Sequence, residues 1–447
     1  MKGLIPIPSG LEERVREAAD LIGEVKHIRV VSHYDSDGIS SAAVLAGMLK
    51  NASKPFQVTM TRSLDADIIE RLKSERNELV LFSDMGSGQL DLIGGMNTKA
   101  VVLDHHRVTE DTDSIVHINP SMWGFNGTTD VSGATTSFLL AQYLDETNWA
   151  LAPCALAGAY GDMQHLGGYK GINLQVMQKA LERGQIEERL SLSLQGGSAL
   201  EAIALSAEPY FRGYSGRKDL VADLCSQISV DPGKQFADYT EAEMRRLSSV
   251  LMLILASSGC PYEYISQIVS VQHFVKSSGM TISELSSLAN ACGRSERYSV
   301  GLAMELGDGQ ATSEAKSLRS QYNGRVLERL ILLEEGVEQM EHIQCFRSDD
   351  SSLAGALCGL YMSFIGDKSK PTVAYSLSGD SYKISARGTK QLVEKGLDLA
   401  SGLSGASSSV GGVGGGHDIA SGATVPRDEL RKFLGLLDDI TGKQISG

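Results

Sequence analysis

The chain has few cysteines and no long apolar run, and each shortage excludes a class of protein. Its six cysteines are scattered through 447 residues and never form a Cys-x-x-Cys pair, so neither a zinc ribbon nor a disulfide framework is supported. No apolar stretch approaches the roughly 20 residues that cross a membrane. The first ten residues contain two prolines and lack the apolar core of a signal peptide. We therefore expect a cytoplasmic protein with reduced thiols and no membrane partner.

The chain also has fewer basic than acidic residues. Lysine and arginine number 41 against 55 aspartates and glutamates, which gives a net charge of −14. This balance argues against a protein that coats nucleic acid through a generally basic surface. It leaves a nuclease open, because acidic metal ligands add to the total and a local basic groove can coexist with an acidic exterior. The length predicts two or three domains.

Acidic and imidazole side chains follow three apolar runs in the N-terminal region. The runs are separated by helical stretches and are typical of buried parallel strands: 28–32, 79–83 and 100–103. They end at the segment 33–38, at Asp84 and at the triplet Asp104-His105-His106. Ligands of open α/β sheets bind at the carboxyl ends of the strands, so we expect the three clusters to converge on one crevice. Carboxylates packed this closely need a neutralising charge, and a divalent metal is the simplest one.

The predicted metal ligands come from four places in the chain: Asp35, Asp37, Asp84, His105 and Asp162. Mixed carboxylate and imidazole sites suit manganese or magnesium better than zinc or copper. Four carboxylates exceed the need of one ion, so we expect two ions about 3.5–4 Å apart, with Asp84 as the bridge. The alternative is that strand-end aspartates only cap the following helices. Capping is common for any one aspartate, but it does not require histidines.

Two more histidines belong to these clusters. His33 precedes Asp35 by two residues. It is interpreted as a sixth ligand or as a hydrogen-bond donor to a ligand, with a packed histidine as the alternative. His106 is next to a predicted ligand and is better placed to meet a substrate phosphate or to protonate a leaving group.

These residues carry a family resemblance. The triplet Asp104-His105-His106 resembles the motif that gives the DHH phosphoesterase superfamily its name, and the whole chain is similar to RecJ-type members. The segment 33–38 resembles the first family motif, Asp84 the second and Asp162 the fourth. The resemblance implies two manganese ions, with magnesium possible, bound by Asp35, Asp37, Asp84, His105 and Asp162. It also implies that His106 meets the scissile phosphate and that Asp104 orients its neighbours.

Two further stretches resemble RecJ-type substrate contacts. Residues 290–294 read Asn-Ala-Cys-Gly-Arg, similar to a RecJ signature, which implies that Asn290 and Arg294 lie near a substrate phosphate. A loop arginine is otherwise usually just solvated. Residues 414–417 read Gly-Gly-Gly-His and resemble the motif of the DHH-associated C-terminal domain. The resemblance implies a substrate surface made by Gly415, Gly416, His417, Ser385 and Arg387. A glycine-rich linker is the alternative for this stretch.

The predicted fold is α/β. We expect a doubly wound parallel-sheet DHH domain at 1–185, a mainly helical connector at 186–340, and a smaller mixed α/β domain at 341–447, with a cleft between lobes. In the last domain, 372–376 and 382–386 predict paired strands around a turn, and 390–399 and 427–437 predict helices. The stretch 401–416 is of low complexity. The chain is shorter than bacterial RecJ and lacks an added OB-fold pattern, so it resembles the archaeal RecJ-like nucleases, including those associated with the GINS replication complex.

The leading functional prediction is a manganese-dependent exonuclease on single-stranded DNA or RNA, in replication or repair. One alternative keeps the chemistry but takes short oligonucleotides, cyclic dinucleotides or a bisphosphate nucleotide. Another is a replication-complex scaffold subunit, like the degenerate eukaryotic helicase component of this superfamily. Such a scaffold should have lost ligands, and here all five predicted ligands are present. Digestion polarity, the choice between DNA and RNA, and the oligomeric state stay open.

Overall fold

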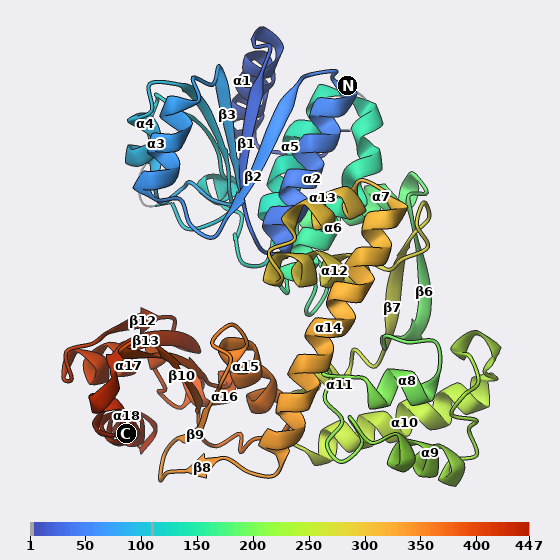
Figure 1. Ribbon diagram of the computed structural model, residues 1–447. Helices are drawn as coiled ribbons and strands as arrows, with labels where there is room; N and C mark the ends of the chain where they lie inside the picture. The colour runs from blue at the N-terminus through green and yellow to red at the C-terminus, as the bar shows by residue number, and fades with distance from the viewer. Residues whose placement is uncertain (1–3, 109–110, 447) are drawn as a thin grey trace. The chain divides into compact units, whose positions relative to one another are not determined.

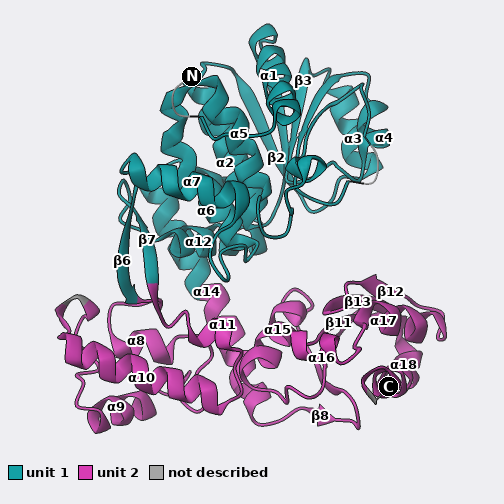
Figure 2. Cartoon of the chain, turned by 180° about the vertical axis from the view of Figure 1, so that it is seen from behind, with its two compact units in different colours: residues 1–191, 271–320 teal, residues 192–270, 321–447 magenta. Residues whose placement is uncertain are grey.

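The computed structural model describes residues 4–108 and 111–446, which form two compact units (Figure 2). Unit 1 comprises Met1–Ser191 and Val271–Ser320, and unit 2 comprises Leu192–Ser270 and Gln321–Gly447. The chain therefore leaves unit 1, returns to it and leaves it again. The division differs from the predicted boundaries at 185 and 340, because part of the predicted connector folds into unit 1.

Unit 1 is built on a parallel five-stranded sheet with the order β2-β1-β3-β4-β5. Its strands are β1 (Ile28–His33), β2 (Phe56–Thr61), β3 (Leu79–Ser83), β4 (Lys99–Leu103) and β5 (Val116–Ile118). Successive strand residues point to opposite faces, so Val30 belongs to one apolar core and Val31 to another. Both faces of the sheet are therefore buried, which explains the nearly continuous apolar runs.

Helices cover both faces of this sheet, as the doubly wound prediction requires (Figure 1). One face packs against α1 (Ser9–Glu24), α2 (Ser36–Asn51), α5 (Gly133–Leu144), α6 (Ala152–Gly161) and α7 (Gly171–Glu182). The other face packs against α3 (Ala66–Ser74) and α4 (Leu90–Gly94). Two 3₁₀ turns, η1 (Pro120–Trp123) and η2 (Glu146–Leu151), complete this part.

The returning segment adds a small core of its own to unit 1. It contains α12 (Ile282–Arg294), α13 (Tyr298–Glu305) and the first part of α14 (Gly309–Glu334). Leu288 and Cys292 of α12 pack with Ile39 of α2, in the helix that follows the first acidic cluster. Strands β6 (Ile186–Leu192) and β7 (Val269–Val275) pair with each other where the chain changes unit. The predicted connector is thus less purely helical than its composition suggested.

Unit 2 combines a helical part with a mixed sheet. The helical part contains α8 (Ala199–Ala204), α9 (Lys218–Gln227), η3 (Phe236–Asp238), α10 (Glu241–Ser257) and α11 (Tyr262–Ile265). The sheet has the order β12-β13-β11-β10-β9-β8, and its strands are β8 (Glu338–Gln339), β9 (Gln344–Arg347), β10 (Thr372–Ser378), β11 (Ser381–Arg387), β12 (Val413–Gly416) and β13 (Ala420–Pro426). The predicted antiparallel pair around residues 378–380 is confirmed as β10 and β11. Its helices are α15 (Ala354–Phe364), α16 (Lys390–Glu394), α17 (Leu399–Ser408), η4 (Arg427–Glu429) and α18 (Leu430–Ser446).

The glycine- and serine-rich stretch at 401–416 is folded, so the linker interpretation is wrong. Most of α17 and all of β12 lie in it. Leu399, Leu403, Ala406 and Val410 recur at helical spacing and enter the core of the sheet, which anchors a helix made otherwise of small residues. The predicted helix at 390–399 is interrupted after Glu394, and the one predicted at 427–437 starts with η4 and runs on to Ser446. Within the described residues, no helix is both long and apolar enough to cross a membrane.

Candidate metal centre

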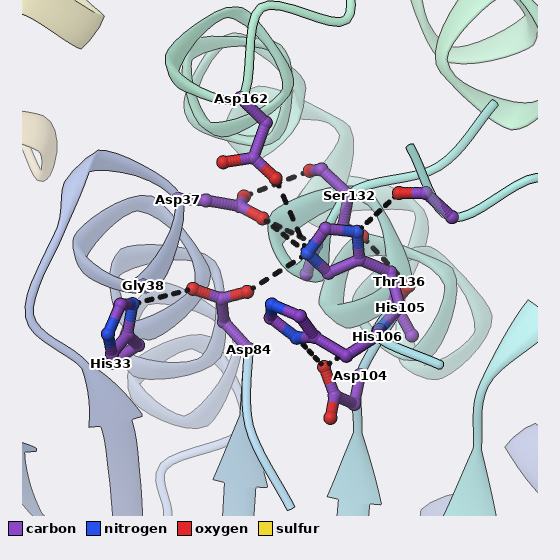
Figure 3. Close-up of polar contacts among 12 residues, drawn as sticks. His33, Asp37, Gly38, Asp84, Asp104, His105, His106, Ser132, Thr136 and Asp162 are labelled. Atoms are coloured by element: carbon purple, nitrogen blue, oxygen red, sulfur yellow. Dashed lines mark hydrogen bonds and ion pairs between the residues drawn. The ribbon is translucent and has the colours of Figure 1, made fainter. Parts of the chain in front are cut away.

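Eight of the residues predicted from the sequence meet at the carboxyl edge of the parallel sheet, and Figure 3 labels all of them except Asp35. They follow β1, β3 and β4 or lie at the ends of α2 and α6, and their possible ligand atoms fall into overlapping groups: His33, Asp35, Asp37, Asp84, Asp104, His105, His106 and Asp162. The structure therefore brings the three strand ends together, with Asp162 beside them.

Asp84 lies between two groups of possible ligands. Its Oδ2 is 3.5 Å from Nδ1 of His33, and its Oδ1 is 3.2 Å from Nε2 of His105. One carboxylate thus offers one oxygen to each histidine, which is the geometry expected of a bridging ligand. Asp84 is 3% exposed and has a φ of 56°, in the left-handed region that aspartate tolerates better than most residues.

Asp35 shows that capping and ligation are compatible. Its Oδ1 accepts a hydrogen bond from the backbone N–H of Gly38 at 3.0 Å and so caps the N-terminus of α2. Its Oδ2 lies 3.0 Å from Nδ1 of His33. The capping alternative is therefore correct for one oxygen of this aspartate, while the other oxygen faces the possible ligands His33 and Asp84.

His105 is oriented so that one ring nitrogen faces the carboxylates. Its Nδ1 lies 2.6 Å from the carbonyl oxygen of Gly127, which can only accept, so Nδ1 donates. Its Nε2 then lies 3.2 Å from Asp84 and 3.3 Å from Asp162. Figure 3 shows the imidazole of His105 facing both carboxylates. This nitrogen is buried and has no hydrogen-bond partner among the described residues. A buried imidazole nitrogen without a partner, facing carboxylates, fits a metal ligand.

The N-terminus of α5 holds Asp37. Ser132 Oγ and the N–H of Ala134 donate to Oδ1, each at 2.9 Å, and the N–H of Gly133 donates to Oδ2 at 2.7 Å. The partial positive charge of a helix N-terminus stabilises a carboxylate. Burial and the nearby Asp84 nevertheless raise the pKa of Asp37 to about 7. The site therefore contains more negative charge than its own donors neutralise.

The pKa values of the neighbouring groups show the same excess. Burial and Asp37 raise the pKa of Asp162 well above its usual range. Burial by itself would lower the pKa of His33, yet Asp35 and Asp84 raise it to about 10. Burial likewise opposes the charged form of His105, and Asp84 and Asp37 raise its pKa well above the ordinary value. Divalent cations bound here would offset the negative charge that raises these pKa values.

Two glycines let backbone approach the carboxylates, and sequence reasoning missed both. A Cβ on Gly133 would lie 2.6 Å from Cβ of Asp84, and one on Gly158 would lie 2.2 Å from Oδ1 of Asp37. Only glycine therefore allows α5 and α6 to pack this closely against the site. The available signal was a glycine at the start of a predicted helix and another inside an apolar helix.

Asp104 orients the triplet to which it belongs. Its Oδ1 accepts hydrogen bonds from the N–H of His105 at 2.8 Å and from Nδ1 of His106 at 2.7 Å. Its Oδ2 accepts from the N–H of Ser87 at 2.9 Å. Burial alone would raise the pKa of Asp104, but His106 and His105 hold it well below its usual range. The hydrogen bond to Asp104 in turn raises the pKa of His106, whose side chain is 59% exposed.

A second layer from β5 and its neighbouring loops supports this triplet and was also missed. Asn119 Nδ2 donates to the carbonyl oxygen of His106 at 2.8 Å and to Ser87 Oγ at 2.9 Å. Ser87 Oγ lies 2.9 Å from Nε2 of the fully buried His117, whose Nδ1 lies 3.2 Å from Asp111. These residues gave no sequence signal, because they acquire their roles only through tertiary contact.

The Asn-Ala-Cys-Gly-Arg segment lies next to the first motif. It forms the end of α12, and a Cβ on Gly293 would lie 2.3 Å from the carbonyl oxygen of Tyr34. Asn290 is half-buried, and Arg294 is exposed at the C-terminal end of the helix. The structure thus places this segment beside the predicted ligands of β1.

The remaining predicted residues lie together in unit 2. Ser385 on β11 pairs with Gly422 on β13, which pairs with Gly415 on β12, so the three form one row across the sheet. Arg387 ends β11, Gly416 ends β12, and the exposed His417 follows. These residues form a second cluster, separate in sequence from the possible metal ligands.

Two stretches of the chain match known families. Residues 27–159 match the DHH family, N-terminal domain, and residues 349–443 match the DHHA1 domain. The first covers the parallel sheet, and the second covers most of the mixed sheet. An uncharacterized protein of Methanocaldococcus jannaschii is 29% identical over 437 residues, which are 95% of each chain.

Solved structures share the fold. RecJ from Thermus thermophilus in complex with Mn²⁺ is similar with a TM-score of 0.58 and 16% identity, over 98% of this chain and 55% of the RecJ chain. This chain therefore spans about half the length of that RecJ. CDC45 from Entamoeba histolytica is similar with a TM-score of 0.65 and 11% identity, over 97% of this chain and 99% of its own. The chain thus belongs to the DHH superfamily, with DHH and DHHA1 domains and a RecJ-like fold.

Proposed function

We propose that this protein is a manganese-dependent exonuclease that hydrolyses phosphodiester bonds of single-stranded DNA or RNA. The observation that carries the proposal is the double role of Asp84, which offers one oxygen to His33 and the other to His105. DHH-superfamily proteins are typically phosphoesterases or nucleases. A complete set of carboxylate and imidazole ligands supports retained catalysis in this member.

We assign the residues to two ligand groups, with Asp84 in one and next to His105 of the other. His33, Asp35 and Asp84 would hold one ion, and Asp37, His105 and Asp162 would hold the other with Asp84. Bound Mn²⁺ or Mg²⁺ would supply Lewis acidity toward the phosphate and lower the pKa of a water molecule. Asp104 holds Nδ1 of His106, so the remaining nitrogen of this exposed imidazole is available to a substrate phosphate or to a leaving oxygen.

Substrate binding is proposed at two surfaces. Asn290 and the exposed Arg294 lie beside the first motif, where a guanidinium can pair with a phosphate through two hydrogen bonds. In unit 2, Ser385, Arg387, Gly415, Gly416 and His417 would contact the strand, and the glycines would allow close approach of its backbone. A role in replication or repair, and a GINS-type partner, belong to the same proposal.

End-labelled substrates test the proposed activity. The purified chain should shorten single-stranded DNA or RNA in Mn²⁺, and Asp84→Asn should abolish this. Asp91→Asn, which changes an exposed aspartate of α4, should leave it intact. Survival of both long substrates, with cleavage of dinucleotides or cyclic dinucleotides, would replace the exonuclease proposal by the short-substrate alternative.

The likeness to CDC45 favours a second candidate, a scaffold subunit of a replication complex. It rests on fold similarity over nearly the whole of both chains. A scaffold without activity should hydrolyse none of these phosphodiesters in Mn²⁺ or Mg²⁺, and the substitution at Asp84 should not affect assembly with a partner. Hydrolysis that depends on Asp84 would exclude a purely structural role.

A further inference from the structure

Gln164 occupies an unusual turn directly after Asp162. Helix α6 ends at Gly161, and Met163 takes a φ of 59°, so the chain reverses. The N–H of Gln164 then donates back to the carbonyl oxygen of Ala159 at 3.0 Å, as in a helix-ending turn with a left-handed residue. The side chain of Gln164 is only 4% exposed and points into the protein rather than to solvent.

The amide of Gln164 holds the loop that orients His105. Its Nε2 donates to the carbonyl oxygens of Gly127 and Val131, each at 3.1 Å. The Gly127 oxygen is the same atom that accepts from Nδ1 of His105. Gln164 and His105 thus share one carbonyl oxygen as their hydrogen-bond acceptor.

The oxygen of the same amide is linked through hydrogen bonds to α5, the helix whose N-terminus holds Asp37. Oε1 of Gln164 accepts from Nδ2 of the fully buried Asn173 at 2.6 Å. Oδ1 of Asn173 accepts from Oγ1 of Thr135 at 2.8 Å. Thr135 and Ser132 form the capping box of α5, and Ser132 donates to Asp37. One chain of amides thus connects the surroundings of Asp162, His105 and Asp37.

We infer that Gln164 is a positioning residue of the metal centre, which fixes Nε2 of His105 toward the carboxylates and thereby favours manganese over magnesium. The inference rests on the proposed function. Magnesium takes oxygen ligands, whereas transition metals such as manganese also accept imidazole nitrogen. A misdirected His105 should therefore weaken manganese binding more than magnesium binding. The hydrogen-bond partner behind His105 is the Gly127 carbonyl that Gln164 holds, and loss of such a partner typically costs about 10–100-fold in metal affinity.

The test compares metal affinities of the full chain after metal removal, measured by titration calorimetry with Mn²⁺ and Mg²⁺ separately. Gln164→Met keeps a side chain of similar length without its hydrogen bonds. It should weaken Mn²⁺ binding about 10–100-fold and Mg²⁺ binding by less. Gln175→Met on α7 is the matched control, because it changes a partly buried glutamine outside this chain of amides and should leave both affinities unchanged.

A second variant separates positioning from stability. Asn173→Leu breaks the same chain at its next member, so the double variant should lose little more Mn²⁺ affinity than Gln164→Met alone. Unchanged Mn²⁺ affinity in Gln164→Met overturns the inference. Equal weakening of both metals, together with a lower unfolding midpoint of the metal-free protein, also overturns it, because Gln164 would then be merely structural. If the wild-type chain itself binds no Mn²⁺, the proposed function fails instead.

Discussion

His106 donates a hydrogen bond from Nδ1 to Oδ1 of Asp104 across 2.7 Å, and the two groups shift each other's pKa in opposite directions. Asp104 is almost completely buried, but backbone N–H groups of Ser87 and His105 also donate to it, so it stays charged. The imidazole of His106 is therefore held in one orientation and keeps its proton to a higher pH than an ordinary histidine.

Asp104→Asn should remove the charge that keeps His106 protonated. If protonated His106 assists the leaving oxygen, kcat should fall by about 10²–10⁴-fold, the usual contribution of a general acid. The alkaline limb of the pH–rate profile should also move to lower pH, because the pKa of His106 returns toward its ordinary value. Measured kcat between pH 6 and 10 checks both effects. An unshifted alkaline limb would mean that His106 acts without donating a proton.

Substitution of Asp84 should separate its backbone role from its charge. Asparagine tolerates a φ of 56°, so Asp84→Asn should keep the fold while losing activity and at least one of two bound ions. Asp84→Ala should lose the same ions and in addition about 1 kcal/mol of stability, because alanine is strained in the left-handed region. Metal counting and urea unfolding in the metal-free state measure the two effects. Two ions retained in Asp84→Asn would contradict the bridge.

Metal affinity should rise with pH. The pKa of Asp37 is raised to about 7 and that of His33 to about 10, so at neutral pH these groups hold protons that a metal must displace. Mn²⁺ binding should therefore release protons, and its affinity should fall steeply below pH 7. Calorimetry in two buffers with different ionisation enthalpies counts the protons. Binding without proton release between pH 6 and 8 would contradict the ligand assignment.

Glu305 should make folding stability depend on pH. Burial raises the pKa of this carboxyl to about 8, and Ser40 Oγ donates to its Oε1. The unfolded chain loses this proton near pH 4.5 while the folded chain keeps it, so stability should decrease between about pH 4.5 and 8. Glu305→Gln should match the wild type near pH 4.5 and be more stable, by up to a few kcal/mol, at pH 8.

Urea unfolding in the presence of a chelator measures this difference without interference from metal binding. Glu335→Gln changes an exposed glutamate just after α14 and serves as the control, with no expected pH-dependent change. Parallel stability curves for the wild type and Glu305→Gln from pH 5 to pH 8 would show that Glu305 is ionised in the folded protein.

Arg387→Ala should weaken substrate binding more than it slows chemistry. Arg387 lies on the sheet of unit 2 and is not among the metal ligands, so KM for a single-stranded oligonucleotide should rise while kcat changes little. Arg347→Ala, an exposed arginine on β9 of the same sheet, is the control. An unchanged KM in Arg387→Ala would remove this residue from the proposed substrate surface.

The sequence predicted the meeting of the possible metal ligands because strand ends can be recognised from local sequence. An apolar run followed by Asp84 or by Asp104-His105-His106 carries its own signal, and parallel strands bring such ends to one edge. The supports of the site carry no such signal. Ser87, Asn119 and Gln164 are ordinary polar residues in sequence, and only the folded chain puts them against Asp104, His106 and Gly127, respectively. Their contribution is long-range in sequence and could not be predicted from local patterns.

The same limit explains the differences in unit 2. A glycine-rich linker was the alternative for the low-complexity stretch 401–416, because glycine and serine dominate it, yet a few apolar positions at helical spacing suffice to fold it. The structure of this stretch is therefore determined by the packing of its few apolar side chains in the core of the sheet, which its overall composition does not reveal. The predicted connector at 186–340 is divided between the two units for a related reason, since α12 and α13 pack on Ile39 of unit 1.

Gly158 and Gly133 offer a way to sort related sequences whose activity is unknown. Each marks a place where a helix backbone touches a carboxylate so closely that no methyl group fits. A protein that has abandoned its metal ions can keep aspartates by chance, since they remain compatible with the fold. Such a protein no longer needs glycine at these two positions. An alanine or larger residue at either position would therefore be an early mark of a member that has lost catalysis, readable even where every aspartate and histidine remains.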